Sequence, residues 1–275
     1  MVNGVTVPEV RARKGGRRLV MITAYDTPGA RIADAAGVDL ILVGDSVANN
    51  VLGYDDTLQV TVDDMERHVA AVARAHTRAL VVADLPWLSY HSGPASAVTN
   101  AGRLVRAGAG GVKLEGGRKR LGVVEALTDA EIPVMGHLGL TPQSVLAMGG
   151  FKVQGRGGEA IARLQEDASA LADAGVFAIV LEGIPDRVAQ SITESVPVPT
   201  IGIGAGRECD GQVLVFHDLL GLGHLPVPRF VRQYASLAQD ASAAIGRWAD
   251  DVRDGSFPSD DESYHLPEQA ARDPR

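Results

Sequence analysis

Acidic residues follow directly on short apolar runs at several places in the chain. Asp45 closes the run DLILVGD, Asp84 closes ALVVAD, Lys113 and Glu115 end GGVKLE, and Glu182 ends FAIVLE. A near-continuous apolar run of this length is typical of a buried parallel strand. A carboxylate at the end of such a strand faces either solvent or a site shared with other strand ends. Four ends of this kind favour a shared site.

Two aspartates on neighbouring strand ends would make a hard, anionic oxygen site of the kind that Mg²⁺ favours. A metal ion held by Asp45 and Asp84 could act as a Lewis acid on a chelating 2-oxo acid, which would acidify the proton beside the keto group and stabilise the enolate. A separate carboxylate must then accept that proton. Glu182 is the candidate, because partial burial at a strand end would make it a stronger base.

The neighbouring polar residues fit the same chemistry. Lys113 could supply a positive charge for the substrate carboxylate or an amine for a Schiff base, and we favour the charge. Ser46 could donate a hydrogen bond to that carboxylate. Glu115 lies two residues beyond Lys113 and should point the same way, so it could complete the metal shell through water. By position alone, Asp45 and Asp84 could equally be caps or turn residues, and Lys113 a solvated charge.

Apolar, β-branched runs recur along the chain and alternate with segments of helical spacing, which indicates βα units and a parallel sheet. The predicted strands are Leu19–Thr23, Leu40–Val43, Leu80–Ala83, Gly111–Leu114, Pro133–Met135, Phe177–Leu181, Thr200–Ile203 and a weaker Val213–Val215. The predicted helices run from the cap Thr61 to about His76, and over Pro94–Ala107, Gly157–Ala174, Pro185–Ser195 and about Arg229–Arg253.

Eight strands over 275 residues predict an α/β fold, a single-domain (β/α)₈ TIM barrel. A doubly wound open sheet is the alternative. In a barrel the functional groups lie at the carboxyl ends of the strands, where His137 would join the residues named above. We expect residues 1–266 to form the catalytic barrel with an N-terminal extension and a C-terminal helix, and residues 267–275 to be a disordered tail.

Composition excludes several function classes. The formal net charge of −8 argues against binding to nucleic acid or to anionic membranes, and the aromatic content of 4% leaves few stacking platforms. No apolar run approaches the ~18 residues that span a bilayer. A single cysteine, Cys209, permits no internal disulfide and no cysteine-based zinc cluster. We expect a cytoplasmic protein whose partners are small molecules or copies of itself.

Longer strings carry a specific resemblance. The strings MITAYDTPGARIADAAGVDLILVGDS, VVADLPWLSY, GGVKLEGG, VMGHLGLTPQSV, GGFKVQGR, LEGIP and PTIGIGAGRECDGQVLVFHDLLG occur in this order. Together they resemble the ketopantoate hydroxymethyltransferase family over about residues 4–265. The resemblance implies a (β/α)₈ barrel that transfers a hydroxymethyl group from 5,10-methylenetetrahydrofolate to 3-methyl-2-oxobutanoate, giving 2-dehydropantoate in pantothenate biosynthesis through a Mg-stabilised enolate. It further implies one Mg²⁺ per subunit and a homodecamer, a pentamer of dimers.

Carried over motif by motif, the resemblance assigns a role to each candidate residue. The metal ligands are Asp45, Asp84 and Glu115, and the catalytic proton acceptor is Glu182. The substrate-binding residues are Asp45, Ser46, Asp84, Lys113 and His137, although the role of His137 is the least defined. The segment SFPSDDESYHL is longer than in the family pattern, which affects only the packing of the C-terminus.

Two other functions compete with this interpretation. The phosphoenolpyruvate mutase and isocitrate lyase types also handle oxo-acid enolates on Mg²⁺, but they commonly use a loop cysteine for which this chain has no matching motif. A catalytically silent barrel that only binds a ligand or builds an assembly would be expected to lack Asp45, Asp84 or Glu182, and all three are present.

Overall fold

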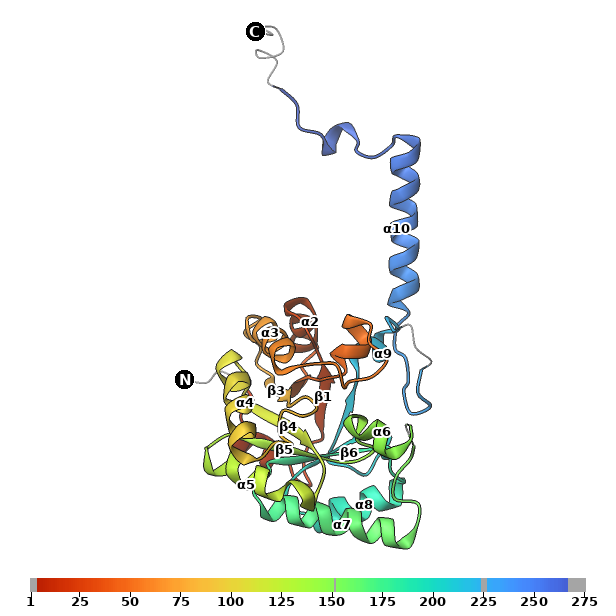
Figure 1. Cartoon of the computed structure of the whole chain (residues 1–275). Coiled ribbons are helices and arrows are strands. Elements are labelled where there is room, and N and C mark those ends of the chain that lie inside the picture. The colour runs from red at the N-terminus through yellow and green to blue at the C-terminus, as the bar shows by residue number, and fades with distance from the viewer. Residues whose placement is uncertain (1–3, 151, 224–226, 267–275) are drawn as a thin grey trace.

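The computed structural model describes residues 4–150, 152–223 and 227–266. Eight parallel strands close into a barrel in sequence order, and β1 pairs with both β2 and β8. Helices surround the barrel (Figure 1). The fold is therefore the single (β/α)₈ barrel that the alternating pattern predicts, and the open sheet is excluded. The strands are β1 Leu19–Thr23, β2 Leu40–Val43, β3 Leu80–Asp84, β4 Gly111–Glu115, β5 Val134–Gly139, β6 Ala178–Glu182, β7 Thr200–Ile203 and β8 Gly211–Leu214.

The helices follow the strands in alternation. The α-helices are α1 Val7–Arg11, α2 Thr27–Ala35, α3 Val62–Ala73, α4 Pro94–Ala107, α5 Leu121–Asp129, α6 Val145–Met148, α7 Gly158–Asp173, α8 Asp186–Ser195, α9 Phe216–Leu220 and α10 Leu237–Asp254. Short helical turns are η1 Ala48–Leu52, η2 Arg118–Arg120, η3 Pro142–Ser144 and η4 Asp260–Glu262, of which η1 is a π-helix. No helix in the described ranges is long and apolar enough to cross a membrane.

Three elements have a boundary that differs from the prediction by more than two residues. The helix capped by Thr61 ends at Ala73, and His76 takes a positive φ of 54° that a continuing helix cannot accommodate. Strand β5 begins after Pro133 and extends to Gly139. The C-terminal helix begins at Leu237 rather than near Arg229. The predicted disordered tail, residues 267–275, lies outside the described residues.

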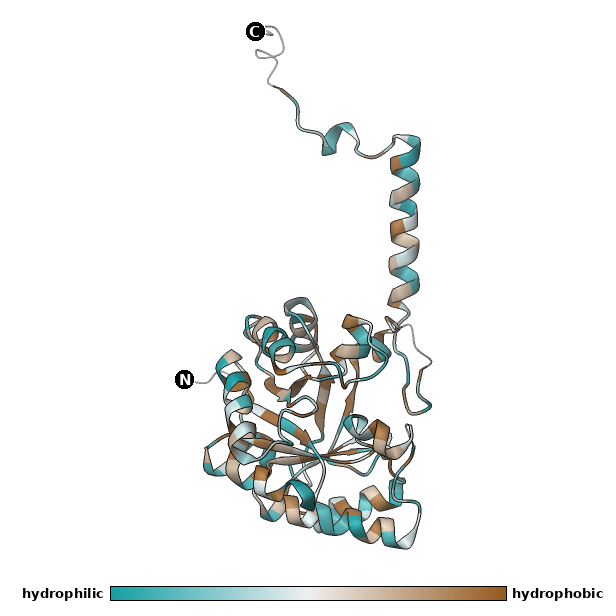
Figure 2. Cartoon of the chain, viewed as in Figure 1, coloured by the Kyte–Doolittle hydropathy of each residue, from teal (hydrophilic) through white to brown (hydrophobic). Residues whose placement is uncertain are grey.

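Successive side chains on each strand point alternately into and out of the barrel, and this divides the apolar core into two parts. One cluster fills the inside of the barrel and includes Leu40, Leu42, Leu80 and Val82. The intervening residues, such as Ile41, pack outward under the helices. Apolar residues accordingly colour the strands at the centre of Figure 2.

The same alternation determines which strand-end groups point inward. On β3, Leu80 and Val82 are followed at the next inward position by Asp84. On β6, Ala178 and Val180 are followed in the same way by Glu182. Apolar side chains therefore fill the inside of the barrel, and ionisable side chains lie at the carboxyl ends of its strands.

Helix α10 does not pack against the barrel as the other long helices do. It extends away from the barrel (Figure 1), and none of its residues is buried. Its exposed apolar side chains are Leu237, Ile245, Trp248 and Val252. The long helix after the last strand therefore does not cover the barrel of its own chain.

Candidate active site

A small cavity of about 110 Å³ lies at the carboxyl ends of the strands. All seven residues singled out by sequence line it: Asp45, Ser46, Asp84, Lys113, Glu115, His137 and Glu182. These residues come from the ends of β2, β3, β4, β5 and β6. The structure thus brings together every sequence-predicted site residue. A cavity well below the ~300 Å³ of a drug-sized pocket suits a small ligand.

The two aspartates are in direct contact. The backbone N–H of Asp45 donates to Oδ2 of Asp84 over 3.0 Å. Lys113, the register partner of Asp84 on the adjacent strand, places its Nζ 2.9 Å from Oδ1 of Asp84. This contact is an ion pair without hydrogen-bond geometry, because Oδ1 accepts no hydrogen bond from the described residues. The three side chains are almost completely buried, which excludes the solvated-charge alternative for Lys113.

Burial and the carboxylates of Asp84 and Glu115 raise the pKa of Asp45 well above its usual range. Burial alone would lower the pKa of Lys113, but the negative charges of Asp84, Glu115 and Asp45 outweigh it and raise that pKa. Lys113 is therefore a protonated, cationic group at neutral pH. The positive charge of Lys113 does not offset burial and the two neighbouring carboxylates at Asp45, so the ionised form of Asp45 is disfavoured.

His137 connects the aspartate end of the cavity with Glu182. Its Nδ1 lies 3.3 Å from Nζ of Lys113 and 3.4 Å from Oε1 of Glu115. Its Nε2 lies 3.2 Å from Oε2 of Glu182, a charge contact without hydrogen-bond alignment. Burial and Lys113 lower the pKa of His137, but the carboxylates of Glu115 and Glu182 outweigh them and raise it to about 9. The imidazole is therefore cationic at neutral pH.

Gln143 is a site residue that sequence reasoning missed. Its Nε2 donates to Oδ2 of Asp45 over 2.7 Å and to the carbonyl of Leu85 over 3.0 Å, and its backbone N–H donates to Oε2 of Glu115 over 3.0 Å. Its Oε1 accepts from the hydroxyl of Tyr90 over 2.6 Å. The available signal was a polar amide in the TPQS turn directly after β5, but no strand pattern points to it.

Tyr25 was also missed. Its hydroxyl lies 2.8 Å from Oγ of Ser46, and the ring is buried. Burial raises the pKa of Tyr25, so the phenol stays protonated and can hydrogen-bond to Ser46. The tyrosine in the MITAYDTPG string could have been flagged because it follows an apolar strand.

The donor set can be tested against Mg²⁺. No group of three or more His, Cys, Asp and Glu side chains within the described ranges is arranged to hold a metal ion. Mg²⁺, however, is commonly held by one or two carboxylates, with water and substrate completing the octahedron. Asp45 and Asp84 offer such a pair, and a divalent cation would stabilise the charged form of Asp45 that its neighbours now disfavour. The residues present fit Mg²⁺ at the two aspartates.

Cys209 takes no part in this site. It is buried, and burial raises its pKa, so the thiolate is disfavoured. This matches the absence of a loop-cysteine motif.

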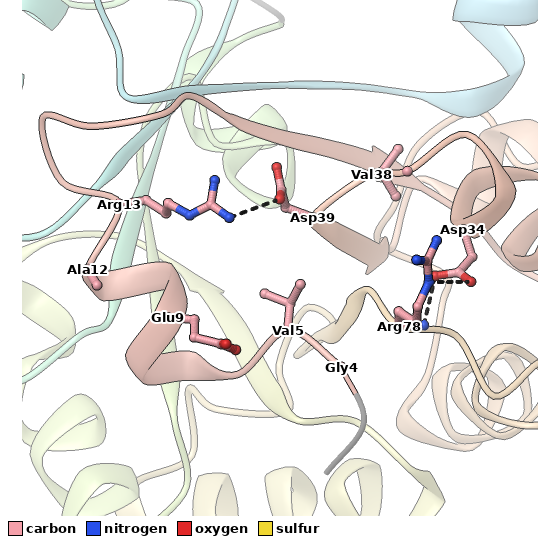
Figure 3. A pocket seen from close by; sticks show the side chains of 10 residues that line it. Gly4, Val5, Glu9, Ala12, Arg13, Asp34, Val38, Asp39 and Arg78 are labelled. Carbon is pink, nitrogen blue, oxygen red and sulfur yellow. Dashed lines mark hydrogen bonds and ion pairs between the residues drawn. The ribbon is translucent and has the colours of Figure 1, made fainter.

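A larger cavity of about 560 Å³ lies beside α1, on the side where the strands begin (Figure 3). Its charged groups form loose pairs, Arg13 with Asp39 and Arg78 with Asp34, each at 3.8 Å. Asp34 also accepts the backbone N–H groups of Arg78 and Ala79. These contacts hold the base of the barrel together, and none of the predicted site residues lines this cavity.

Comparison by sequence gives consistent matches. The family profile described as "Ketopantoate hydroxymethyltransferase" matches residues 4–260. The "3-methyl-2-oxobutanoate hydroxymethyltransferase 2" of Bradyrhizobium diazoefficiens is 56% identical over 266 residues, which cover 96% of this chain and 91% of the relative. The "3-methyl-2-oxobutanoate hydroxymethyltransferase" of Moorella thermoacetica is 55% identical over 262 residues, 94% of this chain and 97% of the relative.

Comparison with solved structures supports the fold. The phosphoenolpyruvate phosphomutase from Streptomyces platensis subsp. rosaceus has a TM-score of 0.62 at 17% identity, covering 97% of this chain and 93% of that one. A phosphonopyruvate hydrolase complex with oxalate and Mg²⁺ has a TM-score of 0.60 at 16% identity, covering 94% and 93%. At such identities the likeness concerns the barrel alone.

Proposed function

Because the chain belongs to the ketopantoate hydroxymethyltransferase family, we propose that it transfers a hydroxymethyl group from 5,10-methylenetetrahydrofolate to 3-methyl-2-oxobutanoate, giving 2-dehydropantoate for pantothenate biosynthesis. The methylene carbon exchanges its two bonds to nitrogen for one bond to C3 of the acid and one to the oxygen of water. The proton from C3 and one proton from water pass to the two folate nitrogens. The reaction needs no oxidant or reductant.

The first step is removal of the C3 proton by Glu182. This carboxylate ends β6, faces the cavity and is the most exposed of the four acidic groups, with 16% of its side chain accessible. His137 beside it, with Nε2 3.2 Å from Oε2 of Glu182, positions this carboxylate towards the cavity. The resulting enolate then attacks the one-carbon unit through C3.

We assign the carboxylate and keto groups of the oxo acid to the side of the cavity opposite Glu182. Lys113 supplies a fixed positive charge for the substrate carboxylate, and Ser46 donates a hydrogen bond to it. Asp45 and Asp84 would hold Mg²⁺, and Glu115, whose oxygens already contact Gln143 and His137, would reach it only through water. When bound, Mg²⁺ would supply Lewis-acid stabilisation of the negative charge that develops on the keto oxygen.

One observation carries this proposal. Glu182, with His137 at 3.2 Å, lies in the same small cavity as the hydrogen-bonded residues Asp45 and Asp84 and the buried Lys113. Anion recognition, oxygen ligands for a divalent cation and a proton acceptor are thereby available to one small 2-oxo acid. This combination favours enolate chemistry over a barrel that only binds a ligand.

The mutase and lyase alternative rests on weaker ground. The solved structures of that kind share the barrel at 16–17% identity, whereas the family profile and relatives above 50% identity point to the hydroxymethyltransferases. A phosphoryl or C–C cleaving activity on phosphonopyruvate or isocitrate is therefore the second candidate, to be assayed in parallel.

The test is product formation from 3-methyl-2-oxobutanoate and 5,10-methylenetetrahydrofolate, followed by mass spectrometry, with and without a chelator. We expect 2-dehydropantoate only when both substrates are present, and loss of activity with EDTA that added Mg²⁺ restores. No product from an intact preparation would reject the assigned reaction. Full activity after exhaustive chelation would reject the metal while leaving the reaction in place.

We place the enzyme in the cytoplasm as a homodecamer built as a pentamer of dimers, as the family resemblance implies. The exposed apolar side chains of α10 support association between copies, because a large unpartnered apolar strip is costly in water. Sedimentation velocity of the full chain would measure the number of subunits.

A further inference from the structure

A second cavity, of about 450 Å³, lies beside the acid cavity at the same end of the barrel. It is enclosed by the turn between β1 and α2, by η1 after β2, by α3 and by α9 after β8. We call it the ring pocket. None of the residues that line it was singled out from the sequence.

The ring pocket shares a wall with the acid cavity. Thr23 and Val215 line the acid cavity, while the next residues along the chain, Ala24 and Phe216, line the ring pocket. The backbone N–H of Phe216 donates to Oγ1 of Thr23 over 3.0 Å and ties the two sides of this wall together. A ligand in the ring pocket would therefore lie one side-chain layer from the assigned acid.

A hydroxyl pair crosses this wall. Tyr25 lines the ring pocket, and its hydroxyl reaches Ser46, which lines the acid cavity, over 2.8 Å. The segment that follows, η1, is a π-helix, a rare form that is frequent at functional sites. The wall is thus built by elements that serve both cavities.

The lining suits a flat heterocycle. Ile32 and Val51 form an apolar rim that is 56% and 50% exposed, and the buried rings of Tyr25 and Phe216 lie deeper. Tyr25 and His217 place their ring centres 5.6 Å apart with a tilt of 37°. Apolar side chains at the rim of a cavity offer surface that an apolar ring can bury.

The pocket also holds unused hydrogen-bonding capacity. Nδ1 of His217 is buried and has no hydrogen-bond partner within the part of the chain that the structure describes. Burial lowers the pKa of His217, so the ring is neutral and Nδ1 can donate or accept. The carboxylate of Asp26 lies at the same pocket. A fused pyrimidine ring with an amino group and a carbonyl on its edge presents matching donors and acceptors.

Size separates the two cavities. The acid cavity, at about 110 Å³, cannot take a bicyclic ring in addition to an oxo acid, whereas about 450 Å³ falls within the range of ordinary ligand pockets. We infer that the ring pocket binds the pterin ring of the tetrahydrofolate donor, with the attached one-carbon unit reaching past the Tyr25–Ser46 pair into the acid cavity, in contact with C3 of the acid. This inference rests on the proposed function, since it assigns a place to the second substrate of that reaction.

The test compares Ile32→Asp, on the rim of the ring pocket, with Val105→Asp, an exposed apolar position on α4 away from both cavities. Tetrahydrofolate binding is measured by titration calorimetry on the full chain. Exchange of the C3 proton of 3-methyl-2-oxobutanoate in deuterated water, without folate, reports the acid site separately. We expect Ile32→Asp to raise the Kd for tetrahydrofolate by at least about tenfold, with wild-type exchange, and Val105→Asp to match wild type in both assays.

Val51→Asp, on the other side of the rim, serves if Ile32→Asp does not fold. Wild-type affinity for tetrahydrofolate in a folded rim variant would overturn the inference while the transfer reaction stands. Loss of C3 exchange in a folded rim variant would also overturn it, because the pocket would then serve the acid site. Wild-type protein that neither binds tetrahydrofolate nor transfers the one-carbon unit would overturn the proposed function itself, and this result is distinct from the other two.

Discussion

Nε2 of His137 lies 3.2 Å from Oε2 of Glu182, on the inner face of two adjacent strands. At its other nitrogen, Nδ1, the imidazole lies 3.4 Å from Oε1 of Glu115, so Glu182 is not the only carboxylate that holds it. The contact with His137 therefore orients the carboxylate of Glu182 towards the cavity before substrate binds. The first prediction follows from this pair.

Glu182→Gln keeps the size of the side chain and removes the proton acceptor. We expect exchange of the C3 proton in deuterated water to fall by about 10²–10⁴-fold, the usual contribution of a general base, while calorimetry gives an affinity for the oxo acid close to wild type. Glu194→Gln, an exposed change on α8, is the control. Undiminished exchange in Glu182→Gln would assign the proton transfer to another group.

The second prediction concerns Lys113. Its raised pKa, caused by neighbouring carboxylates that outweigh burial, leaves the amine protonated and non-nucleophilic. Borohydride reduction in the presence of 3-methyl-2-oxobutanoate should therefore leave the mass of the intact protein unchanged, and Lys113→Met should raise KM for the acid. A reduced adduct on Lys113, located by peptide mapping, would establish the Schiff-base alternative instead.

Binding of Mg²⁺ can be measured through protein stability, without an activity assay. A ligand at a hundred times its Kd adds about 2.7 kcal/mol to the free energy of unfolding, so Mg²⁺ should shift the urea midpoint of metal-free protein upward. Asp45→Asn should abolish this shift. It should not destabilise the metal-free protein, because it replaces a carboxyl group whose charged form is disfavoured by burial, Asp84 and Glu115. The exposed change Asp173→Asn on α7 should retain the full Mg²⁺ response.

Gln143 should matter for stability as well as for the site. Gln143→Ala removes the donor to two buried acceptors, Oδ2 of Asp45 and the carbonyl of Leu85, and leaves the hydroxyl of Tyr90 only its longer contacts with the backbone of Glu115. Unsatisfied groups of this kind cost about 1–3 kcal/mol each, so we expect a loss of at least about 2 kcal/mol in urea unfolding. Gln239→Ala on the exposed face of α10 should change the unfolding free energy by much less. Equal effects in the two variants would remove Gln143 from the network.

The fifth prediction is a pH dependence at Asp210. Burial raises the pKa of Asp210, but hydrogen bonds from Thr200, Lys14 and Gly15 outweigh it and lower the pKa below its usual range. A lowered folded-state pKa stabilises the fold above the unfolded value of about 3.9, and this contribution is lost as the pH falls through the folded value.

Asp210→Asn should therefore destabilise the protein by about 2 kcal/mol at pH 7, with the difference from wild type shrinking in acid. Urea unfolding at several pH values measures both quantities. A difference that is constant down to the acid limit would mean that the charge of Asp210 is not the stabilising feature.

Much of the fold follows from local sequence. The strands Leu19–Thr23, Leu40–Val43 and Thr200–Ile203 were predicted with their observed bounds, because β-branched runs between turn residues are a local signal. The start of α10 was misplaced at Arg229 because amphipathic spacing continues into residues that do not form a helix. Spacing alone does not specify where a helix without a strong cap begins.

Some residues of the site could likewise be predicted from local sequence, and others could not. Glu115 and Lys113 were expected to point together because strand alternation is a two-residue rule, and both line the cavity. Gln143 and Tyr25 lie on turns, where no periodic rule specifies direction, so only the folded chain reveals their contacts. The ring pocket was likewise invisible, since it is assembled from four separate connections.

Helix α10 has one more consequence. Most of the stability of a helix in a protein comes from packing of its apolar face, and this helix of 18 residues buries none of its side chains against its own chain. The free energy that keeps it helical must come from another molecule, which makes its order depend on protein concentration. Progressive dilution should thus melt the C-terminal segment while the closed barrel persists, and protease cleavage near Trp248 would report that separation.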